Sequence, residues 1–455
     1  MDVERILRLA ERMAERYGIE YFEVRVARTR AVLIEMENGS LETLEDNLEV
    51  GIGARAFAGA WGFSSSSDLS KAEEVIKTAM KIAKVSGGDS KIFIGDPVVD
   101  RAEMPVREPF TDIEIGDKVA LVREVDGLLK GKGISARRVV YVDGLKEQIY
   151  LNSVGSEIQT VVPRIRLSFS VTAKGNGGMQ AYWKTFGGTV GWELVEGIDF
   201  PHWTFFVKEK ALELLRARTP PSGEFDVIMD PELTGVFIHE ALGHAAEADS
   251  VKNGESILEG KLGEKIAVDG LRVVDDPTLP GKFGSYVYDD EGIRARRVEI
   301  IRDGILVNYL NDRETAALLG LEPNGHGRAQ SYAHQPLVRM SNTYLEPGDW
   351  SFEEMVSEVK RGLYMIGDKG GQVDTANGTF TFGAKEGYII ENGEIKAHVR
   401  DVALSGKILD VLRNIRAIGK DLRIEFPGYC GKGQWVSVDD GGPHVLTRAI
   451  VGGLG

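Results

Sequence analysis

Two histidines and a glutamate lie close together in the segment His239-Glu240-Ala241-Leu242-Gly243-His244. Histidine nitrogens are common zinc ligands, and a glutamate that follows the first histidine of a helical pair is the usual general base of zinc peptidases. These residue types therefore indicate a metal site that hydrolyses peptide bonds. The spacing is unusual, because these histidines are five residues apart and the standard motif separates them by four.

The five-residue spacing sets a structural condition on this site. An ideal helix turns about 100° per residue, so five steps place two side chains roughly 140° apart, which is too far to share one metal ion. A turn widened to about 4.4 residues, a π-bulge, would bring them within roughly 50°. Gly243 makes such a distortion, or a break of the helix, easier. Metal binding therefore predicts an irregular helix at this motif.

Two histidines and a water leave tetrahedral zinc one protein ligand short. A thiolate is a strong zinc ligand, and Cys430 lies in a glycine-flanked segment, residues 428–433, that suits the presentation of a side chain. The plainer interpretation is that the histidine spacing is a coincidence and Cys430 a small buried side chain. The candidates for the third ligand are Glu247, Asp249, Cys430, His202, His326, His334, His398 and His444.

A helix that starts at Asp230 is predicted to carry the motif. Asp230 is a good N-cap and Pro231 fits the first helical position. A strand at residues 225–229 precedes this helix, and the connection Thr219-Pro220-Pro221-Ser222-Gly223 precedes the strand. Prolines cannot donate backbone hydrogen bonds, so this connection predicts a domain boundary. We predict an N-terminal domain at residues 1–218 and a β-rich C-terminal domain at residues 224–455 that carries the His239–His244 helix.

Apolar periodicity and turn residues predict an α+β fold, with α/β-type layers in the N-terminal domain and a mostly antiparallel sheet in the C-terminal domain. Asn38-Gly39, Asp303-Gly304 and Asn392-Gly393 predict tight turns between strands. Residues 64–67 predict a polar loop, and residues 342–344 fit a strand edge, which could bind an extended peptide. The predicted helices cover residues 3–17, 69–85, 116–129, 206–217, 351–363 and 408–417, and long strand-like runs cover 137–142, 147–152 and 156–173.

The charge and the cysteine content exclude several classes of protein. The 455 residues include 55 Lys plus Arg and 70 Asp plus Glu, a net charge of −15, which argues against a dedicated nucleic-acid binder. No window approaches the roughly 18 uninterrupted apolar residues of a membrane span, and the N-terminal residues lack the features of a signal peptide. The one cysteine fits a reducing compartment. We therefore expect a cytoplasmic protein that binds neither membranes nor nucleic acid.

The chain resembles the TldD/PmbA family, once described as modulators of DNA gyrase, and within it the TldD type. The resemblance covers nearly the whole chain and is strongest from Asp230 onward. Its most specific stretch is Ile238-His-Glu-Ala-Leu-Gly-His-Ala-Ala-Glu-Ala-Asp249. The other matching stretches are residues 327–334, 339–344, 370–374, 388–393 and 430–434.

The resemblance implies a zinc metallopeptidase that acts on small or unfolded peptides in the cytoplasm. It implies that His239, His244 and Cys430 bind Zn²⁺ and that Glu240 is the general base that activates the zinc-bound water. It also implies a heterodimer with a TldE/PmbA-like subunit that lacks the metal residues, and a homodimer stays open. This chain keeps all of these residues, so it is expected to be the catalytic subunit. Tyr429 departs from the small polar residue expected before the cysteine.

Three further residues are candidates for roles near the site. Glu247 lies three residues after His244 and could accept a hydrogen bond from a ligand histidine, or be an ordinary solvated glutamate. Arg328 and His334 could stabilise an oxyanion or hold a peptide carboxylate, or have a structural role. The alternative to a peptidase is a non-catalytic peptide-binding or regulatory protein with a structural zinc site, closed by four protein ligands.

Overall fold

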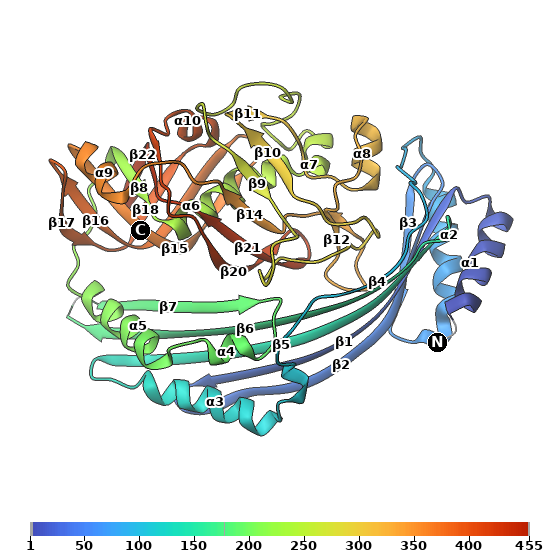
Figure 1. Cartoon of the computed structure of the whole chain (residues 1–455), viewed down its shortest axis with the longest axis horizontal. Helices are drawn as coiled ribbons and strands as arrows, with labels where there is room; N and C mark the ends of the chain where they lie inside the picture. The colour runs from blue at the N-terminus through green and yellow to red at the C-terminus, as the bar shows by residue number, and fades with distance from the viewer. Residues whose placement is uncertain (1–2, 177, 454–455) are drawn as a thin grey trace.

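The computed structural model of the chain describes residues 3–176 and 178–453. Its N-terminal part is built on a long curved sheet with the strand order β3-β2-β1-β5-β6-β4, and β7 pairs with β6. In Figure 1 this sheet sweeps beneath the C-terminal part of the chain and curves up toward α1 and α2. The strands are β1 Tyr21–Glu37, β2 Ser40–Phe57, β3 Trp61–Ser66, β4 Val99–Glu103, β5 Ile134–Asn152, β6 Glu157–Gly175 and β7 Gly178–Gly188.

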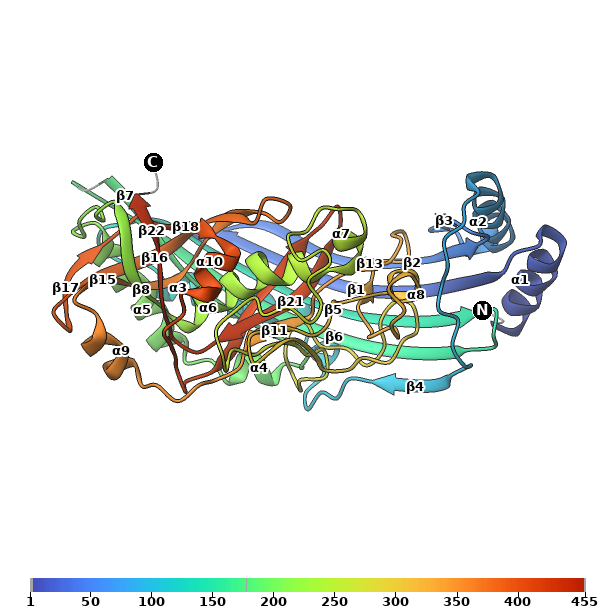
Figure 2. The same ribbon diagram turned by 90° about the horizontal axis from the view of Figure 1, so that it is seen from above.

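Helices cover this sheet in two places. Helices α3 and α5 pack on its outer face, where Phe169 of β6 shares a core with Val122 and Val207. Helices α1 and α2 pack against β1, β2 and β3 at the far end (Figures 1 and 2). Successive strand residues point to opposite faces, so every second residue of β6 faces the C-terminal part instead. The helices are α1 Val3–Tyr17, α2 Ala72–Ser86, α3 Ile115–Leu128, α4 Glu193–Glu196 and α5 Phe200–Leu214.

The C-terminal part contains a closed sheet and an open sheet. The closed sheet has the order β15-β8-β22-β18-β16-β17, and the pairing of β15 with β16 completes the ring. The open sheet has the order β11-β10-β9-β14-β21-β20. Helix α6, Pro231–Val236, contacts both sheets. The strands are β8 Gly223–Met229, β9 Val273–Asp275, β10 Val298–Arg302, β11 Ile305–Leu306, β12 Gly327–Arg328, β13 Leu337–Val338, β14 Asn342–Leu345, β15 Arg361–Asp374, β16 Thr379–Glu391, β17 Glu394–Val399, β18 Val402–Lys407, β19 Ala417–Ile418, β20 Arg423–Gly431, β21 Trp435–Gly442 and β22 Val445–Gly453, and the other helices are α7 Ala248–Lys252, α8 Arg313–Leu319, α9 Phe352–Glu358 and α10 Ile408–Arg413.

The predicted α+β class is confirmed, since helices pack on the margins of sheets whose strand pairs are mainly antiparallel. The predicted turns at Asn38, Asp303 and Asn392 are also confirmed, because each of these residues adopts a positive φ of 50–52° between two paired strands. The proline-containing connection links α5 to β8. The domain bounds 1–218 and 224–455 remain a proposal, and their outermost residues, 1–2 and 454–455, lie outside the described residues.

Three local predictions were wrong. Residues 64–66 belong to strand β3 and pair with β2, because α2 covers one face of this edge and lets the serines stay in a strand. Residues 342–344 do not form an edge, since β14 pairs with both β9 and β21. The helix predicted over residues 351–363 ends at Glu358, because the following residues join the closed sheet as β15.

None of the helices in the described ranges is both long and apolar enough to cross a membrane.

Candidate metal centre

The segment that carries the two histidines changes its winding within a few residues. Helix α6 follows the cap Asp230, whose side chain accepts a hydrogen bond of 2.9 Å from the amide of Leu233. A π-helical turn, Phe237–Gly243, continues the helix, and a short 3₁₀ turn, His244–Ala246, ends it. The irregular winding that the five-residue spacing requires is present, so this prediction is confirmed.

The wide turn brings the two imidazoles together. Their ring centres are 5.4 Å apart and their planes are nearly perpendicular, at 88°. Cys430 joins them from strand β20, with its Sγ 3.3 Å from Nε2 of His244. The potential ligand atoms of His239, His244 and Cys430 all lie within 4.8 Å of one another. The fold therefore assembles two nitrogen donors and one sulfur donor from a helix and a strand that are distant in sequence.

The hairpin of β20 and β21 holds Cys430 against the helix. The carbonyl of Cys430 accepts a hydrogen bond of 2.7 Å from Arg339, which also donates to the carbonyl of Gln434 at 2.9 Å. Arg339 is fully buried, and its two hydrogen bonds join the residues on either side of the hairpin turn from within the core. The helix approaches the hairpin closely, because a Cβ on Gly235 would lie 2.7 Å from the amide nitrogen of Gly441. These contacts set the distance between the thiol and the histidines.

Gly243 ends the π-helical turn, and its replacement tests whether this turn builds the site. A Cβ at Gly243 would lie 2.0 Å from Sδ of the buried Met340, so the turn would have to shift. We expect Gly243→Ala to destabilise the protein by about 1–3 kcal/mol and to weaken metal binding. Denaturant unfolding and competition with a chelator measure the two effects.

Gly127 of α3 provides the matched control, because a Cβ there meets nothing within 4 Å. Gly127→Ala should leave metal binding unchanged and should be neutral or stabilise the fold by about 0.4–1 kcal/mol. A Gly243→Ala protein that matched the wild type in both measurements would show that the turn does not depend on this glycine.

Each of the two histidines has a carboxylate beside its Nδ1 atom. Nδ1 of His239 lies 2.7 Å from Oδ1 of Asp440, and Nδ1 of His244 lies 3.0 Å from Oε2 of Glu247. A carboxylate at one imidazole nitrogen fixes the ring and leaves the other nitrogen available to a metal. The arrangement leaves Nε2 of both histidines available on the side of Cys430. Glu247 thus lies where the sequence suggested, whereas Asp440 was not anticipated.

Asp440 belongs to an acidic pair near the end of β21. Its neighbour Asp439 faces the opposite side and accepts hydrogen bonds from the amides of Phe283 and Phe426. Neighbouring strand residues point to opposite faces, so two consecutive acids must place one on each side of the sheet. The pair is a usable signal in a strand whose other residues are uncharged. The sequence, however, does not show that the histidine helix covers one of those faces.

The charges around the site favour a thiolate. Burial raises the pKa of Cys430, but His239 and His244 outweigh this effect and bring the pKa to about 6. Burial also raises the pKa of Glu247, and His244, Lys432 and Arg339 outweigh it, so that this pKa falls to about 2. At neutral pH the site therefore presents a thiolate and a buried carboxylate. Against the effect of burial, Asp440 and Glu247 respectively raise the pKa of His239 well above its usual value and that of His244 to about 10, so both imidazoles lose a proton when a divalent cation binds.

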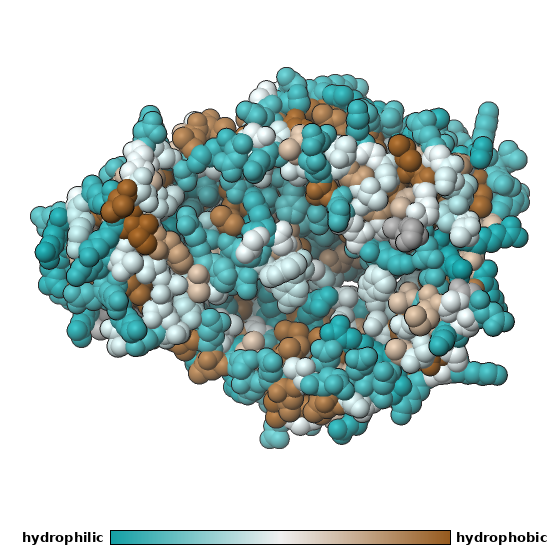
Figure 3. All heavy atoms as spheres, turned by 180° about the vertical axis from the view of Figure 1, so that it is seen from behind, coloured by the Kyte–Doolittle hydropathy of each residue, from teal (hydrophilic) through white to brown (hydrophobic). Residues whose placement is uncertain are grey.

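Glu240 and His239 line a cavity of about 260 Å³ between the helix and the N-terminal sheet. The Glu240 side chain is 38% exposed, and its Oε2 lies 3.7 Å from Nε2 of His244. A neighbouring cavity of about 550 Å³ shares Lys184, Glu232 and Phe426 with the first. Figure 3 shows, from behind, a hollow between the two parts of the chain. The site can therefore admit a substrate from solvent.

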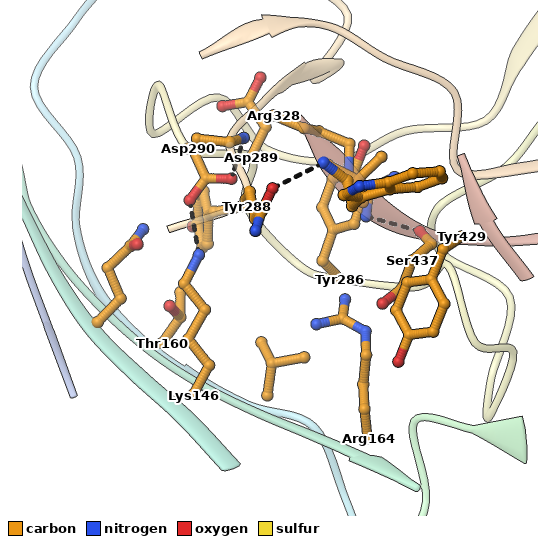
Figure 4. Close-up of a pocket in the computed structure, with 16 residues that line it drawn as sticks. Lys146, Thr160, Arg164, Tyr286, Tyr288, Asp289, Asp290, Arg328, Tyr429 and Ser437 are labelled. Atoms are coloured by element: carbon orange, nitrogen blue, oxygen red, sulfur yellow. Dashed lines mark hydrogen bonds and ion pairs between the residues drawn. The ribbon is translucent and has the colours of Figure 1, made fainter. Parts of the chain in front are cut away.

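The remaining candidates lie elsewhere. Arg328 is buried and donates to the carbonyls of Met340 and Ser437 in a separate cavity (Figure 4). His334 contacts the Ser331 hydroxyl at 3.0 Å. Neither lines the cavity of Glu240. Asp249 binds Lys432. Each of three other histidines binds its own acid: His326 binds Asp275, His398 binds Glu386, and His444 binds Asp421. Within residues 3–176 and 178–453, the cluster suited to a metal is His239, His244 and Cys430, and neither His202 nor the other candidates join it.

Family models match three consecutive parts of the chain. The PmbA/TldA metallopeptidase C-terminal domain matches residues 222–453, the central domain matches residues 108–219 and domain 1 matches residues 22–83. The chain belongs to the PmbA/TldD metallopeptidase family. The family predicted from the motifs is thereby confirmed.

Relatives of the same family align over most of their length. A metalloprotease of Methanothermobacter thermautotrophicus is 44% identical over 438 residues, which are 96% of each chain. A metalloprotease of Methanocaldococcus jannaschii is 39% identical over 95% of this chain and 97% of its own. A zinc metalloprotease TldD homolog of Saccharolobus solfataricus is 41% identical over 54% of this chain and 56% of its own. The predicted activity class, a metallopeptidase, is confirmed by these matches.

Solved structures share the fold of this PmbA/TldD family member. A Thermotoga maritima protein described as a modulator of DNA gyrase superimposes with a TM-score of 0.81 at 23% identity, over 98% of this chain and 99% of its own. TldE of Thermococcus kodakarensis superimposes with a TM-score of 0.75 at 18% identity, over the whole of both chains. At these identities the likeness concerns the fold alone.

Asp440 offers a test of the metal centre of this PmbA/TldD metallopeptidase that leaves the three candidate ligands in place. We expect Asp440→Asn to weaken metal binding by roughly 10–100-fold, because His239 loses the anion that orients it. Competition with a chelator measures this change. Asp439→Asn is the matched control, since burial raises the pKa of Asp439 to about 7 and its side chain is already partly neutral. Equal metal affinities for the two variants would contradict the expected role of Asp440.

Proposed function

We propose that this chain is a zinc-dependent peptidase that hydrolyses small or unfolded peptides, with Glu240 as the general base. The observation that carries this proposal is that Glu240 lines the same cavity as His239, which clusters with His244 and Cys430. Three protein ligands leave one position of a tetrahedral zinc ion open, as catalytic zinc sites do and structural sites do not.

Zinc fits the donor set. Zinc bonds are about 2.0–2.1 Å to histidine nitrogen and about 2.3 Å to cysteine sulfur, so tetrahedral ligand atoms lie roughly 3.3–3.8 Å apart. The sulfur of Cys430 and Nε2 of His244 are 3.3 Å apart, and the full set lies within 4.8 Å. Nitrogen and thiolate donors also suit zinc better than magnesium or calcium. His239, His244 and Cys430 are therefore the residues that would hold the ion.

Glu240 would move the proton of the attacking water. A bound zinc ion supplies a Lewis acid that polarises the scissile carbonyl and acidifies water. The Glu240 carboxylate lies beside His244 at the cavity surface, where it can accept the proton that water releases during attack. The same carboxyl group then donates this proton to the leaving amine. Asp440 and Glu247 hold the two imidazoles in their orientation during these steps.

The alternative, a non-catalytic binding protein with a structural zinc, requires a fourth protein ligand. The described residues supply three in the cluster. Glu247 is already engaged by Nδ1 of His244 and by Lys432, each at 3.0 Å. This arrangement supports the enzyme over the binding protein.

We further propose that the chain is the catalytic subunit of a heterodimer with a TldE-like chain, with a homodimer as the alternative. The likeness of its fold to TldE of Thermococcus kodakarensis supports a partner of similar shape. The presence of His239, Glu240, His244 and Cys430 in one chain supports the catalytic role. A thiol that serves as a ligand must stay reduced, which supports a cytoplasmic location.

The test is incubation of the zinc-loaded protein with a library of unstructured peptides, with cleavage read by mass spectrometry and zinc content measured on the same samples. The protein is assayed alone and mixed with a TldE-like chain. We expect cleavage that depends on zinc in at least one of these mixtures. Bound zinc without cleavage in either mixture would instead support the structural-zinc protein.

A further inference from the structure

Arg166, on the wall of the candidate active site, forms no ion pair with a carboxylate of the described residues. It lies on β6 and lines the same cavity as His239 and Glu240. Its Nε is buried and has no hydrogen-bond partner, and no carboxylate of the described residues forms an ion pair with it. Its neighbour on β7 is Gly187, so no side chain covers Arg166 from that strand.

Two of the other cations of this region are paired, and Lys184, like Arg166, contacts aromatic rings only. Arg164, two residues earlier on the same face of β6, donates to the carbonyls of Phe283 and Ser285 at 3.1 and 3.2 Å. Lys385 forms an ion pair of 2.6 Å with Glu232 on the cavity wall. Lys184 lies over the ring of Trp203, 4.8 Å from its centre. Arg166 and Lys184 are therefore the cations on this cavity that form no ion pair or side-chain hydrogen bond within the described residues, and Arg166 is the one with a planar guanidinium.

Tyr429 contacts this guanidinium on the wall of the same cavity. The Arg166 guanidinium carbon lies 5.6 Å from the centre of the Tyr429 ring, and Tyr429 directly precedes Cys430. Stacking on a ring holds an arginine in place without using its hydrogen-bond donors. Burial lowers the pKa of Arg166, as expected for a charge removed from water without an anion nearby. Tyr429 takes the place of the small polar residue expected before the cysteine, and its ring is what contacts Arg166.

An arginine presents its donors as a planar fork that matches the two oxygens of a carboxylate. The cavity carries charges of both signs, because the acids Glu232, Glu240, Asp368, Glu425 and Asp440 line it together with the cations Arg166, Lys184 and Lys385. We propose that Arg166 binds a carboxylate of the substrate, either the free C-terminus of a peptide or an acidic side chain. This inference rests on the proposed peptidase function, and it assigns Arg166 as a residue that determines specificity.

Equilibrium binding tests the inference without relying on turnover. The zinc-loaded Glu240→Gln protein is titrated into pentaalanine labelled at its N-terminus with the uncharged dye 7-methoxycoumarin, as the free acid, as the C-terminal amide, and as an amide with one internal aspartate. Fluorescence anisotropy gives the three dissociation constants. We expect at least about tenfold tighter binding of one carboxylate-bearing peptide than of the neutral amide, the strength of a charge-assisted hydrogen bond. Tighter binding of the free acid would show that Arg166 binds the C-terminal carboxylate. Tighter binding of the aspartate peptide would show that it binds an acidic side chain.

Two substitutions at Arg166 distinguish direct binding of the carboxylate by this side chain from a general effect of the charge of the cavity. The preference is the Kd of the neutral amide divided by the Kd of the carboxylate-bearing peptide. In the Glu240→Gln protein, Arg166→Gln should reduce this ratio to about one, and Arg166→Lys should restore part of it. Arg28→Gln is the control, since Arg28 is exposed and pairs with Glu147 far from the cavity. Equal binding of all three peptides, an unchanged preference in Arg166→Gln, or no saturable binding would overturn the inference. Peptide cleavage by the wild type, assayed separately, decides the proposed function independently of these results.

Discussion

Replacing Glu240 by glutamine is expected to lower peptide hydrolysis by roughly 10²–10⁴-fold, the usual contribution of a general acid–base residue. Glutamine keeps the size of the side chain but cannot accept the proton of the attacking water. Glu240 is not one of the clustered ligand residues, so zinc content should stay at the wild-type level. The measurement is kcat/KM on a peptide from the cleaved library, together with zinc content. A loss of zinc with the loss of activity would show that Glu240 acts on the metal instead.

A second carboxylate on the same cavity gives the control for this experiment. Glu425 is exposed on β20 and lines the cavity without a place in the ligand cluster. Glu425→Gln removes the same charge from the same cavity, so an effect of cavity charge alone would lower activity in both variants. We expect Glu425→Gln to change kcat/KM by less than about tenfold. A similar loss in both variants would remove the argument for proton transfer by Glu240.

The sequence predicted the local features of this site because they follow from short-range physical constraints. The five-residue spacing of His239 and His244 required a widened turn, and the structure contains a π-helical turn at that position. Asp230 and Pro231 indicated the start of the helix, which the structure confirms. These features depend on backbone geometry within a few residues, and neighbouring segments do not change them.

The contacts that complete the site could not be predicted in the same way. Asp440 contacts His239, although about 200 residues separate them in the sequence. Arg339 donates to the carbonyl of Cys430, although about 90 residues separate them. Their roles depend on which strand the histidine helix covers, and no local pattern encodes that choice. The same reason explains the error at residues 361–363, because pairing with β8 and β16 overrides the helical pattern. Arg166 also carries no sequence signal, since its lack of an ion pair within the described residues is a property of the assembled cavity.

Replacing Cys430 by serine is expected to weaken zinc binding by at least about 100-fold, more than the loss of a supporting carboxylate. The pKa of the Cys430 thiol is about 6, so it is mainly a thiolate at neutral pH, whereas a serine hydroxyl stays protonated and is a poor ligand. Serine is nearly isosteric, and the carbonyl of residue 430 can still accept the hydrogen bond from Arg339. The fold should therefore survive and the metal should be lost.

The stability of the protein in the presence and absence of zinc makes this prediction quantitative. At a free zinc concentration 100 times the wild-type Kd, binding adds about 2.7 kcal/mol to the free energy of unfolding. A variant with a 100-fold higher Kd gains only about 0.4 kcal/mol at that concentration. A chelator should therefore lower the Tm of the wild type and leave the Tm of Cys430→Ser almost unchanged. If the chelator lowers both equally, the metal does not depend on the thiolate, and the third ligand must be sought among Glu247 and the other acids around His244.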